Sequence, residues 1–295
     1  MDSLGIIKLT DAEFKRFAEL IYDRTGIYLE ERKLSLLSNR LRKRLKALKL
    51  KTFAEYYDHV DRLSATDDEM SEFLSVVTTN ETYFFRNDKL WETFKSELIP
   101  GFVRLKESKA RSLRIWSAAA SSGEEAYTAA ISLLENLPDS DNWDIRIVGS
   151  DISQAVLNKA KAAVYNDYAV SKMSSGRIAR WFDVQGEAFH LKPEVKKLVR
   201  FQFHNLRDKF PAGKFDLIFL RNVLMYFDTP MKLRVLEVVT AALAPGGFLI
   251  IGDVDPVSST ADLRDAMSLE KARPGMYQKP LNVGSGSTAK PLVTT

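Results

Sequence analysis

The chain has 295 residues, a formal net charge of +4 at pH 7 and no cysteine. This length allows two modest domains, and the absence of cysteine excludes disulfides and thiolate metal sites, as expected for a reducing cytoplasm. No apolar run approaches the length of a membrane span, and the N-terminus lacks the apolar core of a signal peptide. We therefore expect a cytoplasmic protein that does not enter the membrane.

The first part of the chain, residues 1–87, is predicted to form an all-helical domain. Thr10 begins a capping-box spacing ahead of an amphipathic run, and Gly26 is suited to end that helix. The same Thr-x-x-Glu spacing recurs at Thr52 and at Thr66, which predicts two further helix starts.

A basic helix is predicted between Arg32 and Lys49, with leucines along one side and basic residues on the others. Acidic side chains are almost absent from this segment, so its charges are not neutralised within the helix. A solvated face is the ordinary explanation, but the excess of charge favours docking on an acidic partner surface. Nucleic acid is a weaker candidate, because no aromatic side chains alternate with the charges. The residues expected to dock are Arg40, Arg42, Lys43, Arg44 and Lys46.

A strand that feeds a helix through small residues is predicted near the middle of the chain. Ile115 and Trp116 belong to the buried strand, and Ala119–Gly123 form the turn before the helix. Small side chains allow a ligand to lie against the backbone at a helix N-terminus. An ordinary tight turn is the alternative, because the G-x-G-x-x-G spacing is absent.

Three later segments favour a methyltransferase that uses S-adenosylmethionine (SAM). Residues 146–151 form a second strand that ends at Asp151, whose carboxylate is placed to accept hydrogen bonds from ribose hydroxyls. Residues 215–220 form a third strand that runs into Arg221, and a Pro245–Gly247 turn precedes a further buried strand. This order is typical of SAM methyltransferases, whereas a dinucleotide dehydrogenase would need three spaced glycines. The predicted fold is therefore α/β, with a Rossmann-like sheet.

The methyltransferase domain is expected over residues 88–280. Residues 78–87, which are polar and aromatic, suit a lid between the domains. A hairpin at Gln185–Gly186 interrupts the strand–helix alternation, which predicts a small antiparallel β insertion over about residues 175–198. The Gly/Ser/Thr-rich tail, residues 281–295, is expected to be disordered.

With these features, the chain resembles the chemotaxis receptor methyltransferase (CheR) family over roughly residues 8–278. The matching stretches are T-T-N-E-T-Y-F-F-R at 78–86, W-S-A-A-A-S-S-G-E-E-A-Y at 116–127, S-D-I-S at 150–153, N-L at 205–206 and F-D-L-I-F-L-R-N-V-L-M-Y-F at 215–227. The resemblance implies methyl transfer from SAM to glutamate side chains on the signalling helices of a chemoreceptor, leaving S-adenosylhomocysteine (SAH). It also implies an N-terminal helical domain, a SAM-binding α/β domain and an inserted three-stranded β subdomain.

The resemblance also implies the roles of particular residues. Arg86 and Tyr226 would face the reacting carboxylate, and no metal is expected, because the three histidines are scattered without ligand spacing. The residues that would hold the cofactor are Asn80, Thr82, Arg86, Glu124, Asp151, Asn205, Leu206, Arg221 and Asn222.

Two departures from the family pattern bear on the substrate. Gly252–Asp253–Val254–Asp255 stands where the family usually has G-H-S-E, which leaves a catalytically weakened SAM-binding regulator as an alternative. An RNA methyltransferase is a further, less favoured alternative. The hairpin around Gln185–Gly186 lacks the longer glycine-flanked loop of members that grip a receptor's C-terminal tether. We therefore expect a monomer that docks on the receptor coiled coil without a tether and does not bind nucleic acid.

Overall fold

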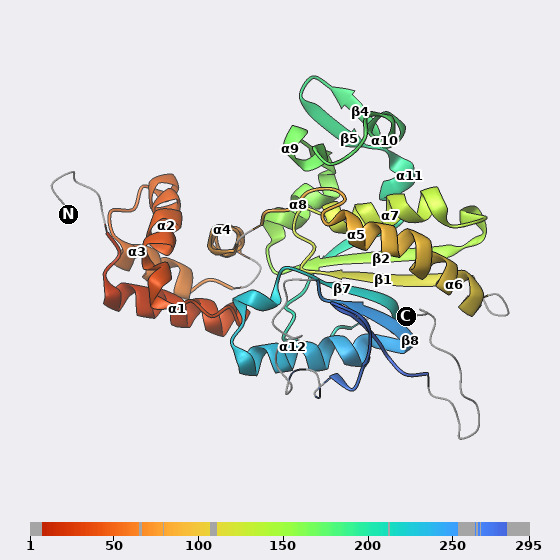
Figure 1. The fold of residues 1–295 in the computed structure, drawn as a ribbon. Coiled ribbons are helices and arrows are strands. Elements are labelled where there is room, and N and C mark those ends of the chain that lie inside the picture. The colour runs from red at the N-terminus through yellow and green to blue at the C-terminus, as the bar shows by residue number, and fades with distance from the viewer. Residues whose placement is uncertain are drawn as a thin grey trace.

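The computed structural model describes residues 8–281 except 65–66, 79, 107–110, 212, 253–262, 264 and 266. The chain forms a helical domain beside an α/β domain, with a small sheet above the latter (Figure 1). The Asp253–Val254–Asp255 departure lies outside the described residues, and so does the expected disordered tail apart from Leu281.

The helical domain begins and ends its first helix where the sequence predicts. Thr10 and Thr52 both form capping boxes, and Gly26 ends the first helix with φ 79°. Asp67 is the N-cap of the last helix, one residue after Thr66, which lies outside the described residues. The helices are α1 (Asp11–Thr25), the 3-10 helix η1 (Glu31–Lys33), α2 (Leu34–Leu48), α3 (Phe53–Asp61) and α4 (Asp68–Val77). Among the described residues, none of the helices has both the length and the apolar character required to cross a membrane.

A seven-stranded sheet organises the α/β domain, with strand order β6-β2-β1-β7-β8-β10-β9. The first five strands in this order run parallel, and β10 pairs antiparallel with both β8 and β9. The strands are β1 (Ser112–Ala118), β2 (Asp144–Asp151), β6 (Val199–Phe203), β7 (Phe215–Leu220), β8 (Leu243–Ile250), β9 (Glu270–Arg273) and β10 (Met276–Gln278).

The predicted turn at Pro245–Gly247 is an irregularity inside β8. Pairing with β7 jumps from Leu243 opposite Phe215 to Phe248 opposite Leu217, so the residues between are accommodated as a bulge. The turn prediction was wrong in this respect, because the strand resumes on the same neighbour.

Helices cover both faces of the sheet (Figure 1). Trp116 and Ile218 face the core shared with the helical domain and α12 (Thr229–Ala242), whereas Ile115 and Leu217 face the opposite core. Alternate residues of a strand point to opposite faces, so two buried faces require the continuous apolar runs seen in the sequence. The opposite face is covered by α5 (Asp88–Thr93), the π-helix η2 (Phe94–Leu98), α6 (Ile99–Lys106) and α7 (Glu124–Asn136).

The small sheet is antiparallel with strand order β3-β5-β4. Its hairpin turns at Gly186, which has φ 59°, as the sequence predicts. The strand β3 comes from before the range of about 175–198 expected from the sequence. The elements of this part are α8 (Gln154–Ala162), β3 (Val164–Tyr165), α9 (Asp167–Val170), α10 (Ser175–Trp181), β4 (Phe182–Gln185), β5 (Ala188–Leu191) and α11 (Pro193–Lys196).

The end of α1 is fixed to the α/β domain by polar contacts. The Tyr22 hydroxyl donates to Asp228 at 3.1 Å, and Asn205 Nδ2 donates to the carbonyl of Arg24 at 3.0 Å. Gly26 has φ 79°, a left-handed conformation that favours glycine, and it packs against the end of the Met231 side chain. The helical domain therefore forms part of the wall of the site described next.

Candidate active site

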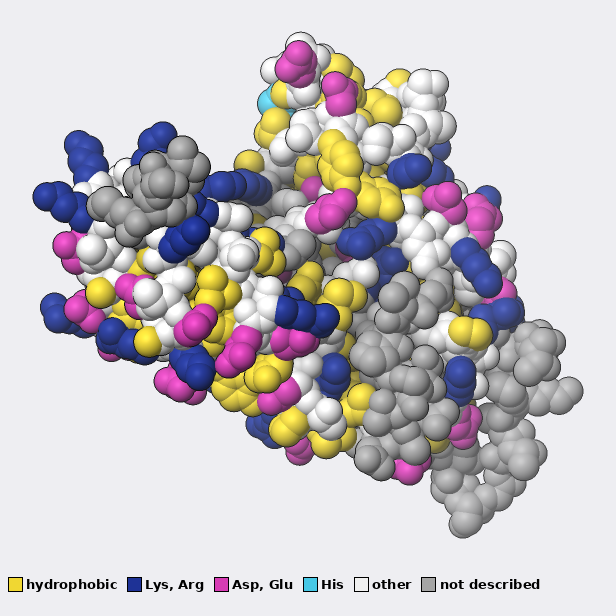
Figure 2. Space-filling model, turned by 60° about the vertical axis from the view of Figure 1, so that its left-hand side comes forward, with side chains coloured by type: hydrophobic (Ala, Val, Ile, Leu, Met, Phe, Trp, Pro, Cys, Tyr) yellow, Lys and Arg dark blue, Asp and Glu magenta, His cyan; other side chains and the backbone are white. Residues whose placement is uncertain are grey.

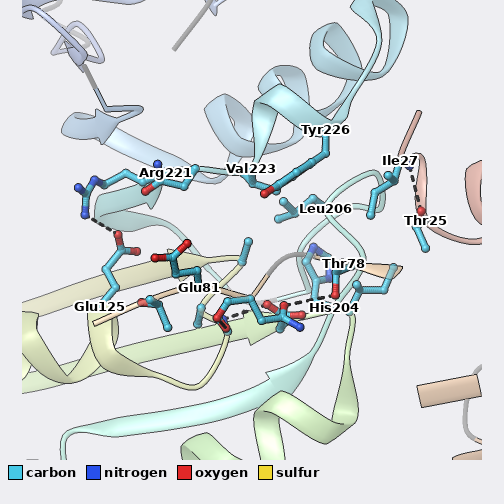
Figure 3. Close-up of a pocket in the computed structure, with 18 of the residues that line it drawn as sticks. Thr25, Ile27, Thr78, Glu81, Glu125, His204, Leu206, Arg221, Val223 and Tyr226 are labelled. Carbon is cyan, nitrogen blue, oxygen red and sulfur yellow. Dashed lines mark hydrogen bonds and ion pairs between the residues drawn. The ribbon is translucent and has the colours of Figure 1, made fainter. Parts of the chain in front are cut away.

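A cavity of about 980 Å³, including its open mouth, lies at the carboxyl ends of the central parallel strands. This volume is within the usual range for small-molecule sites. Figure 3 shows Arg221 and Glu125 at one end, and Thr25 and Ile27 of the helical domain at the other. Nine of the predicted site residues line the cavity: Asn80, Thr82, Arg86, Asp151, Asn205, Leu206, Arg221, Asn222 and Tyr226.

The turn after β1 brings backbone close to the cavity. Ala119, Ser121 and Gly123 all have positive φ, of 63°, 49° and 94°. A Cβ on Gly123 would lie 2.8 Å from the Phe201 ring, so the turn packs too tightly for a larger residue there. Helix α7 begins directly after the turn, at Glu124. The predicted strand–turn–helix is confirmed, with the helix beginning two residues before Ala126.

Asp151, at the end of β2, is buried and held by two backbone amides. Its Oδ2 accepts from the amide of Ser121, and its Oδ1 accepts from that of Ser153, both at 3.0 Å. Burial raises the pKa of the carboxyl, and the backbone donors oppose that shift. Each oxygen keeps an unused lone pair, so the carboxylate can accept two further hydrogen bonds from a ribose diol.

Glu124 does not line the cavity, although the resemblance implied that it holds the cofactor. Its side chain is buried, and both carboxyl oxygens accept from the Ser122 hydroxyl, at 2.9 and 2.8 Å. Burial raises its pKa to about 7, against the effect of the Ser122 hydroxyl. Glu124 therefore supports the turn before α7 through its hydrogen bonds with Ser122.

The neighbouring Glu125 lines the cavity instead, and sequence reasoning missed it. Its Oε2 pairs with Arg221 at 2.9 Å, and its Oε1 accepts from the Ser117 hydroxyl at 2.8 Å. Ser117 and Arg221 come from the ends of the adjacent parallel strands β1 and β7. Two consecutive residues at the start of a helix point in different directions. The sequence alone does not fix where the helix starts, so it could not show which of the two glutamates faces the cavity.

The segment between the domains covers the cavity and is fixed at both ends. The carbonyl of Asn80 accepts from the Ser121 hydroxyl at 3.3 Å, and the Asn80 side-chain amide donates to the carbonyl of Ser75 at 3.2 Å. At the other end of the segment, the carbonyl of Arg86 accepts from Arg221 Nη2 at 3.2 Å. These bonds place the segment against the pocket turn, as expected for a lid.

Tyr226 lies across the cavity from Thr78 and His204, with its hydroxyl end toward the middle of the view in Figure 3. Its carbonyl accepts from the amide of Tyr28 at 2.8 Å. Lys33 Nζ lies 5.9 Å from the centroid of its ring. The helical domain therefore fixes the backbone of Tyr226 and places a cation over its face.

The structure divides the predicted docking residues on α2 into two groups. Arg44 is largely buried and pairs with Glu69 and Glu72 of α4, and Arg40 Nη1 donates to the carbonyl of Val77 at 2.6 Å. The other three are Arg42, which bonds the side chain of Asn39, and the exposed residues Lys43 and Lys46. The sequence argument considered only partners within α2 and missed those on α4.

Among the described residues, no group of three or more His, Asp and Glu side chains is arranged to hold a metal ion. The cavity fits SAM: the buried Asp151 carboxylate can accept from ribose hydroxyls, small residues bring the backbone close, and Glu125 can face the cofactor's ammonium group. The two-domain fold and this cavity define a SAM-dependent methyltransferase.

Comparison with known proteins gives the family. Residues 12–78 match the all-alpha domain of CheR methyltransferase, and residues 80–273 match its SAM-binding domain. A probable chemotaxis protein methyltransferase of Rhizobium etli is 36% identical over 247 residues, covering 82% of this chain and 91% of the relative. Chemotaxis protein methyltransferase 2 of Pseudomonas aeruginosa is 39% identical over 250 residues, covering 82% and 86%. Chemotaxis protein methyltransferase 2 of Vibrio cholerae is 31% identical over 276 residues, covering 92% and 94%.

The chain therefore belongs to the CheR family of SAM-dependent methyltransferases in chemotaxis. The resemblance stated from the sequence motifs is confirmed, as are the fold class and the cofactor. The enzyme class is protein-glutamate O-methyltransferase.

Proposed function

We propose that this enzyme methylates glutamate side chains on the cytoplasmic signalling helices of chemoreceptors, and so adapts the sensory response. One observation carries the proposal: the cavity that contains Asp151, suited to hold a cofactor, also contains Arg86 and Tyr226. A cofactor bound at the strand ends and a glutamate carboxylate near Arg86 and Tyr226 would then lie in the same cavity.

The chemistry requires alignment more than proton transfer. SAM, when bound, supplies an electrophilic methyl group on sulfonium sulfur. A glutamate with an ordinary pKa near 4.3 is ionised at neutral pH, so no strong general base is needed. Arg86 can orient that carboxylate through its guanidinium, and the Tyr226 hydroxyl can donate one further hydrogen bond. The lid excludes water that would otherwise solvate the nucleophile.

The exposed basic residues of α2 are proposed to dock on the receptor. Figure 2 shows Lys and Arg side chains along the upper edge of the helical domain, at the left of the view. Lys43 and Lys46 are exposed and belong to α2. A coiled coil with runs of glutamate is complementary in charge to this face.

Recognition is proposed to need no C-terminal tether. The strands β4 and β5 are joined by Gly186 and Glu187 alone, which leaves no long loop to grip a peptide. A receptor fragment that lacks the tether should then be methylated as well as one that carries it.

The test is transfer from SAM labelled in its methyl group to receptor cytoplasmic fragments, followed by treatment with base. Carboxyl methyl esters release volatile methanol, whereas methylated nucleobases do not. Base-labile label in the receptor supports the proposal. Binding of SAM without transfer to any receptor fragment would instead indicate a regulator, and label in added RNA would indicate a nucleic-acid enzyme.

A further inference from the structure

Glu81, in the segment between the domains, places a second carboxylate beside the proposed acceptor position. It lines the cavity together with Tyr83 and Arg86, and Figure 3 shows its side chain among those of the wall. Arg86 is proposed to bind the carboxylate of the substrate, and a neighbouring glutamate can compete for the same guanidinium. The partners of Glu81 and Arg86 therefore bear on how the substrate is held.

The carboxylate of Glu81 is bonded to a residue outside the cavity. Its Oε1 accepts from the hydroxyl of Tyr168, on α9, at 2.6 Å. Helix α9 is held against the segment by a backbone bond, in which the amide of Phe84 donates to the carbonyl of Ala169 at 2.9 Å. The rings of Tyr83 and Tyr168 also meet edge to face, with centroids 6.0 Å apart. These contacts fix the Tyr168 hydroxyl beside Glu81.

Arg86 has no carboxylate partner within the part of the chain that the structure describes. Its Nη1 donates instead to the backbone carbonyl of Glu81 at 2.9 Å, and its guanidinium carbon lies 5.8 Å from the centroid of the Tyr83 ring. The guanidinium is thus within one side-chain length of the Glu81 carboxylate. Rotation of the Glu81 side chain can therefore bring the two charges together, and the bond to Tyr168 opposes that rotation.

We propose that Tyr168 is a positioning residue, whose hydroxyl holds the Glu81 carboxylate away from Arg86 and so keeps the guanidinium free for the glutamate of the substrate. The inference rests on the proposed function, because it takes the acceptor to be a carboxylate bound by Arg86. It deepens that function by giving a residue outside the cavity a part in acceptor binding.

The protonation of Tyr168 is consistent with this role. The hydrogen bond to Glu81 raises the pKa of the Tyr168 hydroxyl, and the charge of Arg86 opposes that shift. The hydroxyl therefore stays protonated near neutral pH and can donate to the ionised Glu81.

The test is a double-mutant cycle on methyl transfer to receptor cytoplasmic fragments, with Tyr168→Phe, Glu81→Gln and both changes together. Tyr168→Phe keeps a ring against Tyr83 and removes only the hydroxyl. We expect the KM for the receptor to rise about fivefold, as for a competing ion pair near the surface, with little change in kcat. The affinity for SAH, measured by calorimetry, should stay constant.

Removal of the competing charge should rescue the enzyme. The KM of the double variant should return to near the wild-type value, and Glu81→Gln alone should not raise it. Tyr57→Phe, which removes a tyrosine hydroxyl on α3 of the helical domain, is the matched control and should behave as the wild type. An unchanged KM in Tyr168→Phe, or a raised KM that persists in the double variant, overturns the inference. An equal loss of SAH affinity also overturns it, because Arg86 would then serve the cofactor.

A crystal structure of the Tyr168→Phe variant separates this inference from the proposed function. It should show the Glu81 carboxylate within hydrogen-bond distance of the Arg86 guanidinium, and a carboxylate that stays away from Arg86 overturns the inference. This result does not depend on a receptor. If the wild type transfers no methyl group to any receptor fragment, the proposed function fails, and the structure of the variant still decides whether Tyr168 controls the position of Glu81.

Discussion

The floor of the cavity, formed by Glu125, Arg221 and Asp151, and the exposed face of α2 both carry charged side chains. The charges differ in their burial and in their partners. In the floor, Glu125 is paired with Arg221 and Asp151 accepts two backbone amides, all with little exposure to solvent. On α2, Lys43 and Lys46 are exposed. Buried pairs hold a fixed geometry and are weakly screened, whereas exposed charges act at longer range and are sensitive to salt.

The same contrast divides α2 itself. The side chain of Arg44 is only 18% exposed, and its partner Glu69 also accepts from the Tyr56 hydroxyl at 2.8 Å. Arg44 therefore stabilises the packing of α2 against α4 in the same manner as the cavity pairs. A run of basic residues in one helix can contain both structural and docking charges.

The largest effect is expected for Glu125→Ala, which leaves Arg221 buried without its ionic partner. We expect the free energy of unfolding to fall by about 3–5 kcal/mol, measured by denaturant titration. Replacing the pair together, as Glu125→Leu with Arg221→Met, should recover much of this stability without restoring SAH binding. A single variant as stable as the wild type would contradict the structural role of the pair.

Asp151→Ala tests the cofactor side of the floor. Loss of two charge-assisted hydrogen bonds should weaken SAM and SAH together by about 2–4 kcal/mol, measured by calorimetry. Asp144→Ala, at the opposite end of β2, is the control and should bind both ligands normally. Unchanged affinity in Asp151→Ala would remove this residue from the site.

Glu124 should make stability depend on pH. Its pKa is raised from 4.5 to about 7 in the folded state, so the folded state binds more protons between these values. The free energy of unfolding should therefore fall as the pH rises from about 4.5 to about 7, by at most about 3 kcal/mol from this group. Glu124→Gln should remove this contribution, and Glu187→Gln, on the exposed hairpin, should not. Parallel pH profiles for Glu124→Gln and the wild type would exclude the assignment.

Tyr226→Phe separates binding from chemistry within the cavity. Loss of one donor to the acceptor carboxylate should lower kcat about tenfold, with a smaller change in SAM affinity. Tyr28→Phe, which removes an exposed hydroxyl nearby, is the matched control. A fully active Tyr226→Phe enzyme would leave Tyr226 as a packing residue only.

The smallest effect is expected on α2. The double variant Lys43→Glu with Lys46→Glu should raise the KM for the receptor severalfold without changing SAM affinity, and added salt should diminish the difference. The control reverses the same number of charges at Lys95 and Lys271, away from the helical domain. Arg44→Ala should instead destabilise the protein. An effect of equal size from the control pair would show that only net charge matters.

The sequence by itself determined the features that depend on neighbours along the chain. The capping boxes at Thr10 and Thr52, the small-residue turn after β1 and the acidic end of β2 all follow from local patterns. The hydrogen bonds of helix caps and the φ values of turns involve residues only a few positions apart, so they can be predicted from the sequence. Motif order then placed the chain in its family.

Tertiary structure decided which of these residues meet. In the folded protein Glu125 and not Glu124 lines the cavity, and Arg44 pairs with Glu69 of another helix. The tertiary structure brought Thr25 and Ile27 of the helical domain into the wall of a site formed mainly by the other domain. It also joined Asn205 to the carbonyl of Arg24 at the junction between the domains. These outcomes depend on helix rotation and on contacts between residues far apart in the chain, which no local pattern encodes.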